Sequence, residues 1–193
     1  MIKASAQTRD QIAAAAVKAL QTEGFSGATS RAIGRIGGFN QALIFYHFGS
    51  LDSLLVEALA RTSELRLERY RQALEGVRSV DQLLQVGARL YEEDKASGHM
   101  TVVSQLIAGS VNKPELAAKV LELMEPWIDF AEETLARVVP PVLPIPELAY
   151  AAVTFYMGVN LLTHLDAEGT RTDALFARAE ELAPLVGQLL GSS

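Results

Sequence analysis

Apolar residues recur along this chain at intervals of three and four positions, the spacing that places them on one face of an α-helix. The first such segment runs from about Thr8 to Glu23, and Gly24 follows its end. Its apolar face carries Ile12, Ala16 and Leu20. No stretch shows the strict apolar–polar alternation that indicates a half-buried strand. The pattern therefore predicts an all-α protein.

Glycines, prolines and capping residues divide the pattern into about nine helices. They are predicted over residues 8–23, 30–36, 40–47, 51–76, 79–98, 99–110, 114–139, 147–165 and 172–190. A capping box opens the fifth helix at 79–82, and Pro114 suits the first turn of the seventh. Pro126 is predicted to kink the seventh helix, whereas Pro184, inside the last helix, has no evident function. The proline-rich segment 140–146 is predicted to be a non-helical linker.

Two very short helices joined by a glycine turn are predicted within residues 29–48. Thr29 can cap the first helix, Gly38 supplies a left-handed residue at the turn, and Asn40 can cap the second. The apolar positions that hold the pair together are Ile33, Phe39, Leu43 or Ile44, and Phe48. Followed by a longer helix, such a pair presents a helix end to the major groove of DNA, although it also occurs as plain structure.

The polar residues of this segment favour the DNA-binding interpretation. Asn40, Gln41, Tyr46 and His47 have little reason to be buried, because the apolar positions already account for the packing. Asparagine and glutamine pair well with adenine edges, and tyrosine and histidine can donate hydrogen bonds to phosphate. We therefore expect the second short helix to contact double-stranded DNA.

The charges are unevenly distributed along the chain. The net charge is −6, of which residues 1–60 contribute +1 and residues 61–193 contribute −7. An acidic surface is common in soluble proteins and needs no functional reason. The alternative is that only the N-terminal part meets phosphate while the acidic remainder stays away from it.

Several function classes lack their sequence signals. The chain contains no cysteine, and its histidines His47, His99 and His164 are too scattered for a metal site, so we expect no metal and no other cofactor. It has no phosphate-binding glycine loop after a strand, no nucleophile elbow and no obvious acid/base pair, so we expect no catalytic site and no enzyme. The charged first ten residues do not resemble a secretory signal, so a cytoplasmic protein is expected.

Residues 8–60 resemble the N-terminal domain of TetR-family (TetR/AcrR) transcriptional regulators. The resemblance rests most on the run Phe45–Ser50, with support from Ile12, Ala15, Ala16, Leu20, Gly24, Phe25, Thr29, Ile33, Gly38, Phe39, Asn40, Ala42, Ile44, Asp52, Leu54 and Leu55. It implies a three-helix helix-turn-helix domain at 1–49 and a helical effector-binding and dimerisation domain at 50–193. Members of the family are homodimeric, all-helical repressors, and a small-molecule effector binds their variable C-terminal domain.

Carried onto this sequence, the resemblance implies roles for residues of the helix-turn-helix segment, whose second short helix is here called the reader helix. Thr29 and Arg31 would lie near phosphate, Asn40, Gln41 and Ala42 would face bases, and Tyr46 and His47 would hold the DNA backbone. The chain departs from the family at Leu51, where a phosphate-binding lysine is usual, and at Ser30 and Gly37. We also expect an extended N-terminal arm carrying Lys3 and Arg9 to compensate for the missing lysine.

The two C-terminal helices have the composition of a dimer interface. Helix 147–165 is apolar almost all round, which indicates burial on several sides, although a membrane span is the alternative interpretation. Paired with helix 172–190, it can form a four-helix contact across a two-fold axis. The interface residues expected are Ala151, Ala152, Phe155, Gly158, Val159, Leu162, Leu175, Ala179, Leu182 and Val186.

Large, adaptable side chains between residues 91 and 156 are candidates for an effector pocket. They are Tyr91, His99, Met100, Met124, Trp127, Phe130 and Tyr156. Such residues at helical spacing more often form the core. The acidic run 92–94 is interpreted as a solvated face rather than a cation site. Two functions stay open: an effector-responsive repressor, or a dimeric small-molecule-binding protein of the same fold that has weak or lost DNA binding.

Overall fold

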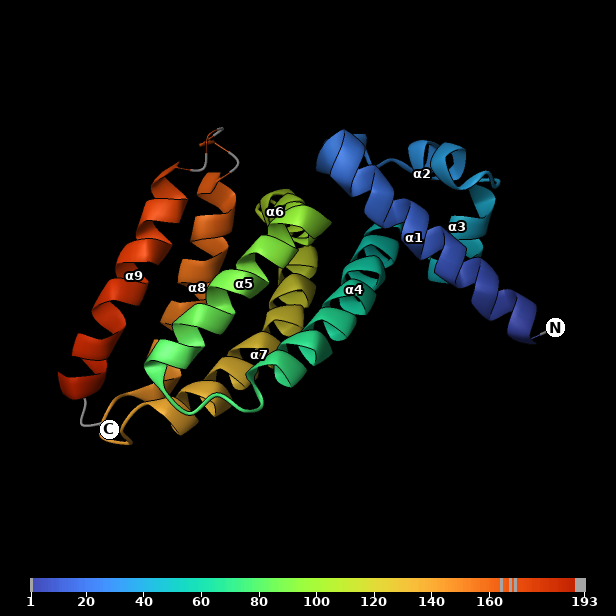
Figure 1. The fold of residues 1–193 in the computed structure, drawn as a ribbon. Coiled ribbons are helices and arrows are strands. Elements are labelled where there is room, and N and C mark those ends of the chain that lie inside the picture. The colour runs from blue at the N-terminus through green and yellow to red at the C-terminus, as the bar shows by residue number, and fades with distance from the viewer. Residues whose placement is uncertain (1, 164, 167, 169, 190–193) are drawn as a thin grey trace. The chain divides into compact units, whose positions relative to one another are not determined.

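A computed structural model describes residues 2–163, 165, 166, 168 and 170–189 (Figure 1). In these residues all regular elements are α-helices, nine in number, and the all-α prediction is confirmed. The helices are α1 (Ile2–Gly27), α2 (Ser30–Gly37), α3 (Ala42–Phe48), α4 (Leu51–Leu74), α5 (Val80–Ser97), α6 (His99–Ser110), α7 (Pro114–Val138), α8 (Ile145–Thr163) and α9 (Thr170–Leu189). The predicted end of the last helix at Leu190, and His164, lie outside the described residues.

The chain forms two compact units. Unit 1 comprises Met1–Leu65 and Thr101–Leu123, and unit 2 comprises Arg66–Met100 and Met124–Ser193. The boundary predicted from the sequence, between a DNA-binding domain at 1–49 and an effector-binding and dimerisation domain at 50–193, stays a prediction.

Unit 1 contains α1, α2, α3 and the first part of α4, together with most of α6 and the first part of α7. Its core is formed by fully buried side chains from four helices: Ile12, Leu20, Ile33, Ile44, Leu54 and Leu59. Gly24 has φ 70° and ψ 178°, so it interrupts α1 where the sequence predicted an end. Gly109 lies against the ring of Phe25, since a Cβ at Gly109 would stand 2.4 Å from ring atoms. The glycine therefore makes room for the phenyl group.

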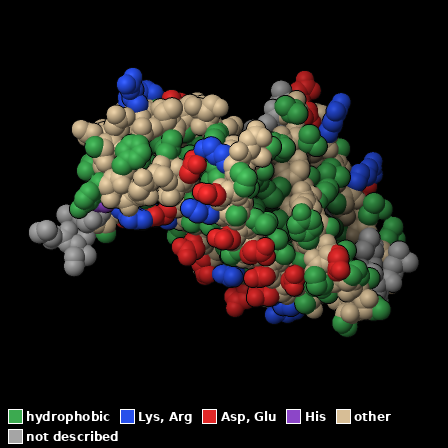
Figure 2. All heavy atoms as spheres, turned by 180° about the vertical axis from the view of Figure 1, so that it is seen from behind, with side chains coloured by type: hydrophobic (Ala, Val, Ile, Leu, Met, Phe, Trp, Pro, Cys, Tyr) green, Lys and Arg blue, Asp and Glu red, His purple; other side chains and the backbone are tan. Residues whose placement is uncertain are grey.

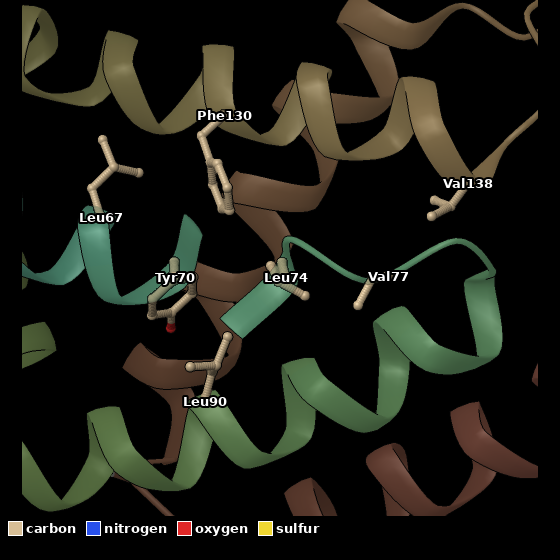
Figure 3. Packing of buried hydrophobic residues seen from close by; sticks show 7 residues of the cluster. All are labelled: Leu67, Tyr70, Leu74, Val77, Leu90, Phe130 and Val138. Atoms are coloured by element: carbon tan, nitrogen blue, oxygen red, sulfur yellow. The ribbon is translucent and has the colours of Figure 1, made fainter. Parts of the chain in front are cut away.

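Unit 2 has a hydrophobic cluster drawn from α4, α5 and α7. Figure 3 shows the side chains of Leu67, Tyr70, Leu74, Val77, Leu90, Phe130 and Val138 directed into one another from these helices and from the turn after α4. The turn is closed at α5 by the predicted capping box: Ser79 Oγ accepts a hydrogen bond from the Gln82 backbone N–H at 3.2 Å. The Gln82 side chain in turn accepts from the Arg78 backbone N–H at 2.9 Å. These two bonds position α5 against the cluster.

Three sequence-based expectations about the helices are wrong. The helix predicted to start at Thr8 starts at Ile2, because 2–7 contain no glycine or proline that would stop it, so these residues are helical and do not form the expected extended arm. The linker predicted to extend to Pro146 ends before Ile145, since a proline in the first helical turn loses no hydrogen bond. Helical spacing from Leu54, Ala58 and others predicts that Leu65 points inward, but its side chain is 78% exposed.

The expectation that α8 is buried on several sides is not met within this chain. Phe155, Leu161 and Leu162 of α8 are all exposed. By length and composition α8 could cross a membrane, and 11% of its apolar stretch is buried. Taken together, α3 and α4 are also long and apolar enough, although the pair is bent by 68°. One or two such helices are weak evidence, because helices that pack in a core or an interface have the same composition.

Candidate DNA-binding surface and buried polar cluster

The turn between α2 and α3 is set by backbone geometry that glycine permits. Thr29 caps α2 as predicted, because its Oγ1 accepts from the Ala32 N–H at 3.2 Å. Gly38 has φ 69° and ψ 29°, the left-handed conformation predicted for it. The Phe39 N–H then donates to the Gly34 carbonyl at 3.0 Å. A Cβ at Gly34 would lie 2.9 Å from the Phe39 carbonyl oxygen, so the close approach of the turn requires glycine there.

The first residues of the reader are held by their own side chains. Asn40 Oδ1 accepts from the Ala42 N–H at 2.9 Å, but α3 begins at Ala42 and its N-cap residue is Gln41, so Asn40 closes the turn before the helix instead of capping it as predicted. The oxygen of the Asn40 amide is therefore occupied by the helix, and the NH2 group keeps its two donors. Ser30 Oγ donates to Gln41 Oε1 at 3.3 Å and links the start of α3 to α2.

Burial and exposure divide α3 into two faces. Ile44 and Phe48 are buried, whereas Ala42 and Tyr46 are exposed, with Tyr46 81% exposed. The His47 side chain is half-buried, and its ring meets the Tyr46 ring edge-on at 4.9 Å between centroids. The exposed face therefore carries polar and aromatic groups above a closed apolar core.

A shallow hollow of about 390 Å³ adjoins the exposed face of the reader. Its lining includes Arg31, Arg35, Phe39, Asn40 and Gln41. Arg31 is exposed, and Arg35 donates to Glu23 at 2.6 Å. Three of the seven predicted DNA-contact residues, Arg31, Asn40 and Gln41, therefore line the same hollow.

Sequence reasoning missed Phe45. It was counted within the family motif, but its side chain is 51% exposed on the same helix as Tyr46. Position 45 follows exposed Ala42 by three residues, so the two share a face of α3. That helical spacing is the signal that would have marked Phe45 as a surface residue.

Arg9 is not available as the DNA-binding residue of an extended arm. Its Nε donates to Glu57 Oε1 at 2.8 Å, and its Nη2 also bonds to Glu57. Its Nη1 donates to the His47 carbonyl at 2.8 Å. The hydrogen bonds from Arg9, together with the charges of Arg9 and Arg61, lower the pKa of the Glu57 carboxyl. The predicted contact between Arg9 and DNA is replaced by these internal bonds.

The predicted effector-pocket residues all belong to unit 2. Tyr91, His99, Met100 and Phe130 are buried, whereas Met124, Trp127 and Tyr156 are half-buried. Tyr70, which sequence reasoning missed, joins three of them: its ring lies 5.1 Å from Trp127, 6.4 Å from Phe130 and 6.4 Å from Tyr156. Tyr91 extends the series, 6.3 Å from Tyr156 and 4.9 Å from Phe176. The structure thus brings the predicted aromatic residues together, largely as packed core.

A buried polar cluster lies within this aromatic group. Asp94 is 2% exposed and forms an ion pair with Arg66. The hydroxyls of Tyr70 and Tyr156 donate to Asp94 Oδ2 at 2.6 Å and 2.5 Å. The interpretation of 92–94 as a solvated face is therefore wrong for Asp94, because Arg66 and two hydroxyls replace water around its carboxylate.

Burial shifts the titration of the groups in this cluster. It raises the pKa of the Tyr70 and Tyr156 hydroxyls above their ordinary value, and the charge of Asp94 adds to the effect. Burial, together with the positive charge of Arg66, lowers the pKa of His99 to about 4, although Asp94 opposes the shift. His99 is therefore neutral at pH 7.

The predicted dimer residues lie mostly at the surface of unit 2. Exposed members are Ala151, Ala152, Phe155, Leu162, Leu175 and Leu182. Gly158 and Ala179 are half-buried, Val159 is buried within the unit, and the side chain of Val186 lies outside the described part. Figure 2 shows hydrophobic side chains at the surface beside clustered acidic ones.

Comparison with known proteins places these features in a family context. The pattern of the bacterial regulatory proteins of the tetR family matches residues 12–58. The HTH-type transcriptional regulator UidR of Escherichia coli is 23% identical over 189 residues, or 96% of this chain and 94% of the relative. The HTH-type transcriptional repressor NicS of Pseudomonas putida is 40% identical over 53 residues, 28% of this chain and 25% of the relative.

A solved structure shares the fold along most of the chain. The transcriptional regulator FadR from Bacillus subtilis, in complex with stearoyl-CoA, superimposes with a TM-score of 0.73 at 16% identity. The match covers 90% of this chain and 96% of that chain. At this level of identity the likeness establishes the fold.

Proposed function

The chain belongs to the TetR family of bacterial transcriptional regulators, and on this premise we propose that it is a homodimeric repressor that leaves its operator when a small-molecule effector binds. The observation that carries the DNA-binding part is the division of α3. Its apolar residues Ile44 and Phe48 are buried in unit 1, while Ala42 and Tyr46 remain exposed, as does Gln41 directly before the helix. A short helix with this division has its polar face free for a partner.

In the proposed complex the start of α3 enters the major groove. Asn40 and Gln41 offer amide donors to base edges, and the Ala42 methyl group reaches the same edges. Thr29, Arg31, Tyr46 and His47 contact phosphate and fix the register of the helix. In this proposal residues 40–42 recognise the base sequence, and the residues that flank them orient the helix on the DNA.

Phe45 adds an apolar contact to this proposal. An exposed phenyl ring beside Ala42 matches the 5-methyl group of thymine, which is the one apolar feature of the major groove. We therefore expect the operator to carry thymine at the base pair that Phe45 meets. A cytosine at that position would lack the methyl group.

The dimer is proposed from the exposed apolar face of α8 and α9. Phe155, Leu162 and Leu182 are large apolar side chains that water surrounds in the isolated chain. A two-fold contact between copies would bury them in a four-helix arrangement, and it would also place two reader helices on one duplex. The same contact accounts for the apolar composition of α8 in a cytoplasmic protein.

The effector site is proposed within residues 50–193, whereas 1–49 form the DNA-binding domain. Tyr91, Trp127 and Tyr156 lie in the aromatic group around Tyr70, and His99 adjoins the same buried cluster. Support comes from the fold relative FadR, which is described in complex with stearoyl-CoA.

The DNA-binding proposal is tested with a selected duplex. Selection from a random double-stranded library yields a preferred sequence, which is titrated by fluorescence anisotropy against a scrambled duplex of equal composition. We expect a strong preference for the selected duplex and, with Tyr46→Ala, affinity about tenfold weaker. Tyr46→Phe separates the hydroxyl from the ring, and Val142→Ala, at an exposed loop position of unit 2, is the control.

The alternative function predicts a different outcome. A dimeric small-molecule-binding protein without useful DNA affinity would bind the selected and scrambled duplexes equally, even at low salt. It would still respond to an effector by thermal stabilisation. Equal affinity of the wild-type protein for the selected and the scrambled duplex would therefore contradict the repressor function.

A further inference from the structure

Arg9 links three helices of the DNA-binding part through one guanidinium group. It lies in α1, it bonds to both carboxylate oxygens of Glu57 in α4, and it donates to the His47 carbonyl in the last turn of α3. Its guanidinium carbon also lies 4.5 Å from the centre of the Phe48 ring. All four contacts are within unit 1.

The contact with His47 falls where α3 needs a partner. The last carbonyl groups of a helix have no acceptor role within the helix, and a positive charge near them is favourable. In α3 the Phe45 carbonyl accepts from the Gly49 N–H at 3.0 Å, and the His47 carbonyl accepts from Arg9. Arg9 therefore satisfies a carbonyl group at the end of the reader helix that has no partner within the helix.

A helix of seven residues depends on such contacts for its orientation. Isolated helices of this length are not stable in water, so α3 holds its direction only through tertiary contacts. The buried side chains Ile44 and Phe48 anchor one face. Arg9 adds a directional contact at the opposite end from the base-reading residues 40–42.

Glu57 is in turn held from a second side. Arg61, one turn later in α4, donates to Glu57 Oε1 at 2.8 Å and also pairs with Asp10, the neighbour of Arg9 in α1. The network thus alternates positive and negative groups between α1 and α4. Because Arg61 keeps Glu57 in place, the Arg9 guanidinium is presented to α3 in a defined orientation.

We propose that Arg9 is a positioning residue for operator recognition, which fixes the end of α3 to α1 and α4 without touching DNA. The proposal rests on the function proposed above. It differs from the arm hypothesis, in which Arg9 binds phosphate. The two roles have opposite consequences for salt dependence and for substitutions at Glu57.

The first test is the salt dependence of operator binding by Arg9→Ala. A positioning role predicts affinity for the selected duplex about tenfold weaker with an unchanged slope of log affinity against log salt, since no phosphate contact is lost. A phosphate contact in each subunit would instead make the slope shallower by about two. Arg31→Ala, at a proposed phosphate contact, is the comparison variant. A shallower slope for Arg9→Ala would overturn the proposal.

The second test uses Glu57→Gln, which removes a negative charge from the DNA-binding part. General electrostatics predicts equal or tighter binding, and the matched control Glu64→Gln, at an exposed carboxylate on the same helix, should show that behaviour. The positioning role predicts that Glu57→Gln binds several-fold more weakly, because Arg9 loses its partner. Binding by Glu57→Gln as tight as by Glu64→Gln would contradict it.

The third test needs no DNA and separates this proposal from the repressor function. Hydrogen exchange of the peptide spanning 40–50 is measured below the melting temperature of each variant. Arg9→Ala and Glu57→Gln should speed exchange there several-fold while exchange in unit 2 stays constant, and Arg9→Lys should restore part of the protection. Unchanged exchange in Arg9→Ala would overturn the positioning role even if the wild-type protein binds its operator.

Discussion

Arg66 and Asp94 form an ion pair inside unit 2, where the side chain of Arg66 is 18% exposed and that of Asp94 is 2% exposed. The second carboxylate oxygen of Asp94 accepts the hydroxyls of Tyr70 and Tyr156. Desolvation of a buried carboxylate is costly, so these three partners stabilise the charge that water would otherwise solvate. The Asp94 carboxylate and its three partners therefore connect α4, α5 and α8.

Removing the carboxylate should destabilise unit 2. Asp94→Ala leaves Arg66 without its partner, so the free energy of unfolding should fall by about 3 kcal/mol. Urea titration followed by the fluorescence of Trp127, the only tryptophan in the sequence, measures the change close to Tyr70. Glu92→Ala, at an exposed neighbouring position, should change little, and the double variant Asp94→Leu with Arg66→Met should recover most of the loss.

His99 should make stability depend on pH. Its folded pKa of about 4 lies below the ordinary value of 6.5, so the unfolded chain binds more protons between those two values. The contribution is fully present above pH 6.5 and is lost as the pH falls toward 4, by about 3 kcal/mol. Thermal or urea unfolding across this range measures it. His99→Gln should flatten the dependence in this window, and an unchanged curve would contradict the assignment.

Gly37 departs from the family pattern, and its neighbour Phe39 gives the physical reason. A Cβ at Gly37 would stand 2.1 Å from Phe39 Cε1 and 3.0 Å from the Ala15 methyl group. Gly37→Ala should therefore displace the ring and lower both thermal stability and operator affinity, with a cost of about 1–3 kcal/mol in unfolding free energy. Adding Phe39→Val should relieve it. Gly87→Ala, where a Cβ meets nothing within 4 Å, is the control.

Leu51 should limit the electrostatic part of DNA binding. It occupies the first position of α4, where the family usually has a phosphate-binding lysine. Leu51→Lys should tighten binding and steepen the salt dependence by about two in log–log slope for a dimer, because one phosphate contact is added in each subunit. Anisotropy titrations between low and moderate salt measure the slope. An identical slope would show that residue 51 does not reach the phosphates.

Leu162 is the sharpest probe of the proposed dimer. It is 63% exposed in α8 of the isolated chain, so Leu162→Glu should do little to the fold of one subunit. In a two-fold contact it would place two carboxylates in an apolar interface, and sedimentation should then show monomers. Val142→Glu, at an exposed loop position, is the matched control. A dimer that survives Leu162→Glu would exclude this part of α8 from the interface.

The helices and the reader could be predicted from sequence because their determinants are local. Thr29 caps α2, Gly38 adopts the left-handed turn and Ser79 opens α5 through bonds that span only a few residues. The apolar spacing likewise identified Ile33 as a core residue, but it left Leu43 and Ile44 as alternatives, of which the structure buries Ile44. The start of α1 could not be read in this way, since no capping residue marks Ile2.

By itself the sequence determined the all-α fold, the helix-turn-helix geometry and the polar face of α3, since capping, glycine conformation and helical periodicity act within one or two turns. Only the tertiary structure decided that Arg9 bonds to Glu57 and to the His47 carbonyl, 48 and 38 residues away. It also decided that Asp94 is buried beside Arg66, Tyr70 and Tyr156. The partner of a charged side chain cannot be read from the local sequence pattern, because it depends on which helices pack together.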